Sequence, residues 1–173
     1  VEAYSMIAPG MPQTAADIGL HYARVAVSGE PLQAAQYWTT LISLTSVSNR
    51  PIEELLHQSL AAVDPASAQA EAVNDAVLQF HEHPDDWKAA RQFFHTKWWF
   101  SKNDKVRMRP GKWNDNSTPL NGAMVILALL YGRGDFYKTG QYAMALGYDA
   151  DCNAATAAAV VGTRIGFSTI EKL

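Results

Sequence analysis

Two aspartates separated by one residue, Asp149 and Asp151, have the residue type and spacing for metal chemistry. They follow Gly147, which ends one predicted helix, and they stand where the next helix begins. Side chains two positions apart at a helix start can converge on one point beyond its end, and two convergent carboxylates are suitable ligands for Mg²⁺. The plain alternative is that these acids only cap the helix and complement its dipole.

Helical periodicity dominates the chain that must position these acids. Alternating strand patterns with hairpin signals are missing, as are fixed-period repeats. We therefore predict an all-α fold in which Asp135 caps one helix. The predicted helices cover residues 13–27, 31–46, 51–60, 65–80, 84–98, 120–131, 136–146 and 151–165.

Length and composition limit the classes of protein to consider. With 173 residues, of which 48% are hydrophobic and 18% charged, the chain can bury one substantial core, so we expect a single domain over residues 1–173. A net charge of -3 argues against nucleic acid as the main partner. No apolar run approaches the roughly 18 residues of a membrane span. The lone Cys152 excludes an internal disulfide and multi-cysteine zinc sites.

The beginning of the chain bears on localisation. It starts at Val1 without an initiator Met, and no signal-peptide pattern follows. We expect the natural N-terminus to lie before Val1. The compartment is therefore left open, with the cytoplasm favoured over a secreted location.

Two ordered motifs surround the aspartates. Asn121 opens an apolar run that ends in Leu-Leu-Tyr-Gly-Arg-Gly-Asp-Phe at residues 129–136, and Gly-Tyr-Asp-Ala-Asp-Cys-Asn-Ala-Ala follows at residues 147–155. In this order they closely resemble the C-terminal signature of the ADP-ribosylglycohydrolase family. Looser likeness at residues 8–10 and 84–87 extends the resemblance over most of the chain.

The resemblance implies a compact orthogonal bundle of helices, of which this chain is the C-terminal portion. It also implies a hydrolase that cleaves the glycosidic bond between ADP-ribose and a protein side chain or related acceptor. The substrate would be an ADP-ribosylated protein or a small molecule containing ADP-ribose. The family's cofactor is usually a pair of Mg²⁺ ions, with Mn²⁺ as an alternative.

The resemblance assigns Asp149 and Asp151 as metal ligands. Cys152 stands where relatives often carry Ser or Thr, and a thiol is a poor ligand for Mg²⁺. The family's other ligands and its general acid come from N-terminal motifs that this sequence lacks. We therefore expect a missing N-terminal segment to complete the site.

Further candidates for substrate binding are Asn121, Ser28 and Gly29. Asn121 either faces the site or caps its helix, while Ser28 and Gly29 form either a substrate-contacting loop or a plain turn between helices. A basic segment could contact a phosphorylated substrate or simply be solvated. Its residues are Lys97, Lys102, Lys105, Arg107, Arg109 and Lys112.

Two other functions remain open at this point. One is a family member without catalysis that acts as a binding or structural protein. The other is a hydrolase of a different N- or O-glycoside, because a metal site alone does not select the leaving group.

Overall fold

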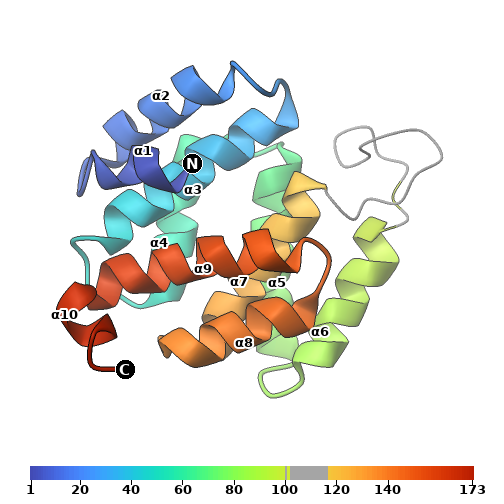
Figure 1. Cartoon of the computed structure of the whole chain (residues 1–173). Helices are drawn as coiled ribbons and strands as arrows, with labels where there is room; N and C mark the ends of the chain where they lie inside the picture. The colour runs from blue at the N-terminus through green and yellow to red at the C-terminus, as the bar shows by residue number, and fades with distance from the viewer. Residues whose placement is uncertain (100, 102–116) are drawn as a thin grey trace.

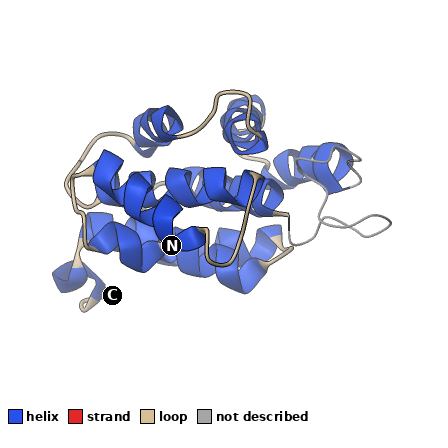
Figure 2. Ribbon diagram, turned by 90° about the horizontal axis from the view of Figure 1, so that it is seen from above, coloured by secondary structure: helices blue, strands red, loops and turns tan. Residues whose placement is uncertain are grey.

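The computed structural model describes residues 1–99, 101 and 117–173. In these ranges every regular element is a helix or a helical turn, which confirms the all-α prediction (Figure 2). The elements are α1 (Glu2–Met6), α2 (Pro12–Ala23), α3 (Glu30–Thr45), α4 (Ile52–Ser59), η1 (Leu60–Ala62), α5 (Ala68–Glu82), α6 (Trp87–Phe94), η2 (His95–Trp99), α7 (Thr118–Gly132), α8 (Phe136–Leu146), α9 (Ala150–Ile165) and α10 (Phe167–Ile170).

Helix α7 forms the centre of the fold. Every residue from Pro119 to Gly132 is buried, as expected of a helix that is apolar on all sides. Helices α3, α4, α5, α6, α8 and α9 all contact it. The position of α7 therefore fixes the helices that carry the candidate site.

Helices α8 and α9 run antiparallel to each other and both pack on α7 (Figure 1). Gly132 allows a close approach between α7 and α8, because a Cβ there would lie 2.8 Å from the Cα of Thr139. The loop between α8 and α9 carries Asp149. This pairing brings that loop to the N-terminal end of α7, where Asn121 lies.

Helices α1 and α2 pack on α3. Gly19 permits the close contact of α2 with α3, since a Cβ would meet the Thr39 side chain at 2.7 Å. Both short terminal helices, α1 and α10, lie outside the sequence predictions. Their five and four residues are too few for a periodic pattern to reveal.

Capping residues explain why two helices begin later than the sequence predicted. The helix predicted from residue 84 begins only at Trp87, because the Asp86 carboxylate accepts hydrogen bonds from the amides of Lys88 and Ala89, each at 3.1 Å. The helix predicted from residue 65 likewise begins at Ala68, after its cap. Asp135 caps α8 as predicted, accepting from the Lys138 amide at 2.8 Å.

Most of the predicted basic segment, residues 102–112, lies outside the described residues. Lys97 is described, and its ammonium lies 2.6 Å from the carboxylate of Asp75 and 2.9 Å from that of Glu71. Among the described helices, none has the length and apolar character needed to cross a membrane.

Candidate metal centre

Residues 147–149 form a tight loop between α8 and α9. Gly147 ends α8 with φ 82° and ψ -150°, a conformation that side chains disfavour. Tyr148 follows with φ 61°, which is uncommon for a non-glycine residue. Such backbone persists only where surrounding contacts hold it. The loop that presents Asp149 is therefore fixed by its neighbours.

The Asp149 carboxylate does not cap the helix it precedes. Asp149 occupies the cap position of α9, yet its side chain accepts no hydrogen bond from the backbone amides of the first turn. The caps of α6 and α8 are also aspartates, and both make such bonds. Capping of the α9 amides therefore does not account for the direction of the Asp149 side chain.

Three potential ligand atoms gather at the start of α9. One carboxylate oxygen from Asp149, one from Asp151 and the Sγ of Cys152 all lie within 4.8 Å of one another. Asp151 and Cys152 are exposed, and Asp149 is half-buried. Two carboxylates this close suit a hard divalent cation such as Mg²⁺, which retains several waters.

Cys152 fits this cation poorly. Its pKa is raised above the ordinary thiol value, first because the thiol donates a hydrogen bond to Asp149. The negative charges of Asp149 and Asp151 raise the pKa further. Near neutral pH the group is therefore a neutral thiol beside the carboxylates, and of the three side chains the two aspartates suit a hard cation better.

The raised pKa of Cys152 gives a test of this geometry in metal-free protein. We expect the rate of alkylation by iodoacetamide to rise with pH at a higher midpoint than for an ordinary cysteine, because only the thiolate reacts. In Asp149→Asn the midpoint should fall, since the nearest negative charge is gone. Equal midpoints in the two proteins would contradict the contact between Cys152 and Asp149.

Asn121 and Asn153 hold the loop from the interior. The Oδ1 of Asn121 accepts from the Asp149 amide at 3.0 Å and from the Asn153 Nδ2 at 2.9 Å. Both side chains are largely withdrawn from solvent, with exposed fractions of 9% for Asn121 and 3% for Asn153. The Asn121 amide therefore faces the loop backbone, and its contact with substrate stays a prediction.

Arg91, His95 and Trp99 hold the loop from the other side. The Arg91 Nε donates to the Leu146 carbonyl at 2.6 Å, which satisfies the C-terminal end of α8. The Tyr148 ring lies 4.9 Å from the guanidinium carbon of Arg91 and 5.1 Å from the Trp99 ring. The Tyr148 hydroxyl lies 3.2 Å from the His95 Nδ1.

These aromatic and cationic contacts were missed in the sequence. Arg91, His95 and Trp99 recur every four residues, a spacing that places them on one face of a helical segment. The spacing could have grouped them, but nothing local indicates that the Tyr148 loop packs there.

Glu2 is another residue near the centre that sequence reasoning missed. Its Oε1 accepts a hydrogen bond of 2.7 Å from the hydroxyl of Thr156, one helical turn beyond Cys152 on α9. Glu2 also contributes to the negative charge that raises the pKa of Cys152. Helix α1 thus adds a third carboxylate to this part of the surface.

The other predicted substrate residues lie at the start of α3. Ser28 is exposed, and Gly29 takes the cap position of α3 with φ 69°. Gly29 lines an open hollow of about 600 Å³ that also includes Arg24, Glu30 and Asp64. Substrate binding by Ser28 and Gly29 stays a prediction.

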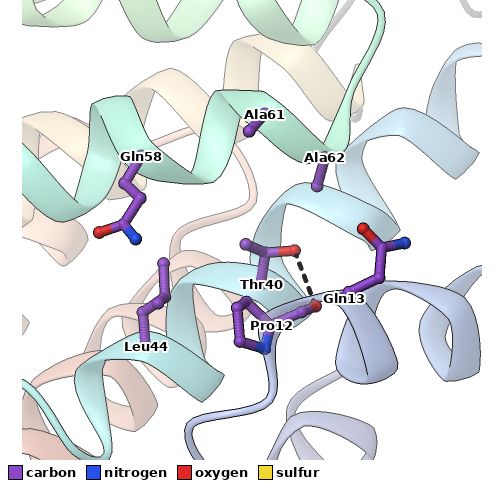
Figure 3. A pocket seen from close by; sticks show the side chains of 7 residues that line it. All are labelled: Pro12, Gln13, Thr40, Leu44, Gln58, Ala61 and Ala62. Atoms are coloured by element: carbon purple, nitrogen blue, oxygen red, sulfur yellow. Dashed lines mark hydrogen bonds between the residues drawn. The ribbon is translucent and has the colours of Figure 1, made fainter.

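A smaller hollow of about 150 Å³ lies between α2, α3, α4 and η1 (Figure 3). Its lining contains no acidic, basic or thiol side chain, so it offers no general acid or base. The residues are Pro12, Gln13, Thr40, Leu44, Gln58, Ala61 and Ala62.

Comparison with protein families gives a match over nearly the whole chain. A family model described as ADP-ribosylglycohydrolase matches residues 3–172. Searches of curated proteins and of solved structures returned no match. The matched range includes Asn121, the loop at residues 147–149 and the whole of α9.

Proposed function

The chain belongs to the ADP-ribosylglycohydrolase family, and we propose that it is a metal-dependent hydrolase of ADP-ribose linked to a protein side chain or related acceptor. The family resemblance deduced from the sequence motifs is thereby confirmed. Metal dependence, the acceptor and the catalytic activity of this chain belong to the proposal.

One observation carries the metal part of the proposal. Asp149 stands where a capping residue stands, but its carboxylate makes no capping bond and instead lies with Asp151 around one exposed point. A carboxylate that capped the helix would bond to the amides of the first turn, as Asp86 and Asp135 do.

Asp149 and Asp151 would hold the cation, with Mg²⁺ as the expected metal and Mn²⁺ as the alternative. When bound, the metal would orient ribose hydroxyls and the attacking water and stabilise charge around an oxocarbenium-like transition state. The two aspartates act as ligands, and neither serves as the general acid.

Two carboxylates leave most positions of an octahedral Mg²⁺ unfilled. Asp149 and Asp151 would therefore share the cation with water, substrate oxygens and ligands outside the described residues. The ligands of a second ion and the general acid would come from the expected segment before Val1. The intact protein is therefore the material for testing activity.

The test is release of ADP-ribose from an ADP-ribosylated protein, with Mg²⁺ present or removed by EDTA. We expect release with Mg²⁺, loss of release in EDTA and recovery when Mg²⁺ is restored. Release that persists after complete metal removal would contradict the metal-dependent mechanism. Binding of ADP-ribose without any release would instead favour a family member that has lost catalysis.

A further inference from the structure

We propose that Asn121 is a positioning residue, whose buried amide sets the place of Asp149 and thereby the affinity of the centre for its cation. The inference rests on the proposed function, because it takes Asp149 as a metal ligand. It adds a role on a different helix, α7, for a side chain that does not itself contact the metal.

A single side-chain amide joins three parts of the chain here. The Asn121 Oδ1 accepts from the Asp149 backbone and from Asn153, and the Asn121 Nδ2 donates to the Ser117 carbonyl at 3.2 Å. The start of α7, the loop at residues 147–149 and the first turn of α9 are therefore all bonded to the Asn121 side-chain amide. Because α7 is the buried centre of the fold, it provides a rigid reference for the loop.

Asn153 extends this network to the other end of the loop. Its Nδ2 donates to the Gly147 carbonyl at 3.3 Å as well as to the Asn121 Oδ1 at 2.9 Å. The backbone is thus held at Gly147 and at Asp149, on either side of Tyr148. These two attachments maintain the left-handed conformation of Tyr148, which directs the chain into Asp149.

The chemistry of the contact requires an amide. Asn121 accepts through one atom and donates through the other, whereas an ionised aspartate could only accept and an aliphatic side chain could do neither. With an exposed fraction of 9%, the position gives little access to water that could replace a lost bond. Removing the Asn121 amide should therefore release the Asp149 backbone.

The test compares Mn²⁺ affinity, measured by electron paramagnetic resonance on the intact protein, in wild type and Asn121→Ala. Loss of a group that orients a metal ligand typically weakens binding by about 10- to 100-fold, and we expect a loss in this range. Tyr131→Phe is the matched control. It removes one hydrogen bond of 2.6 Å, to the His83 carbonyl, at the opposite end of α7.

Tyr131→Phe should lower thermal stability while leaving Mn²⁺ affinity unchanged. A folded Asn121→Ala protein that binds Mn²⁺ as tightly as wild type would overturn the positioning role, even if its stability fell. If Asn121→Ala does not fold, Asn121→Leu replaces it, because leucine keeps about the same side-chain size but can neither accept nor donate a hydrogen bond. Wild-type affinity in that variant would equally overturn the inference.

Asp149→Asn separates this inference from the proposed function. If Asp149→Asn loses Mn²⁺ binding and Asn121→Ala does not, the metal centre stands and only the positioning role fails. If Asp149→Asn binds Mn²⁺ like wild type, the metal centre itself is wrong.

Discussion

We expect Asp149→Asn to release ADP-ribose about 10²- to 10³-fold more slowly than wild type under saturating Mg²⁺. The substitution keeps the size of the side chain but removes the charge that would attract the proposed cation. Metal stabilisation of a transition state contributes several kcal/mol, and each 1.36 kcal/mol corresponds to about tenfold in rate. The measurement is the initial rate of ADP-ribose release by the intact protein.

Asp135→Asn is the matched control, because it makes the same change at the neighbouring helix cap. Asparagine caps helices about as well as aspartate, so α8 should remain intact. We expect this control to retain the wild-type rate. An equal loss of rate in both variants would show that the effect of Asp149→Asn is structural. A wild-type rate in Asp149→Asn would contradict the role of Asp149 as a metal ligand.

The second large effect concerns stability. We expect Leu127→Ala to lower the free energy of unfolding by about 2–5 kcal/mol, because it leaves a cavity in the middle of α7. Leu127 has an exposed fraction of 0%, and α7 contacts six other helices. Urea denaturation measures the change, because the free energy of unfolding falls linearly with urea concentration and can be extrapolated to water.

Leu78→Ala provides the same substitution on a solvent-facing part of α5. Leu78 has an exposed fraction of 52%, so its loss should change the free energy of unfolding by no more than about 0.5 kcal/mol. Similar values for the two variants would contradict the central place of α7.

The sequence was sufficient to predict α7, because the helical pattern from Leu120 to Tyr131 contains an uninterrupted apolar run, Ala123 to Tyr131, that favours burial on every side. Helix starts were less predictable. Asp85 and Asp86 both suit a first turn, and only the three-dimensional structure shows that Asp86 makes the cap. Local sequence does not determine which of two adjacent acids bonds to the amides.

The sequence identified which residue types could form the candidate site, but it did not determine how their side chains are arranged. The sequence places Asp149 at a helix start but leaves capping and metal binding open, because the choice depends on the direction of its side chain. That direction follows from the backbone at Tyr148, which contacts of Arg91 and Trp99 support. These contacts join residues about fifty positions apart, beyond the reach of any local pattern.

Asn121 illustrates the same limit. The sequence left open whether Asn121 faces the site or caps its helix, and the structure shows its Oδ1 bonded to the Asp149 amide. The pairing depends on how α8 and α9 pack on α7 rather than on the neighbours of Asn121 in sequence.

The central claim is that Asp149 and Asp151 hold a divalent cation. The most direct test is a crystal structure of the intact protein grown with Mn²⁺, with anomalous diffraction recorded near the manganese absorption edge. We expect an anomalous peak coordinated by carboxylate oxygens of both aspartates, and its disappearance in crystals of Asp149→Asn. Fully ordered aspartates with no anomalous peak between them at saturating Mn²⁺ would contradict the claim.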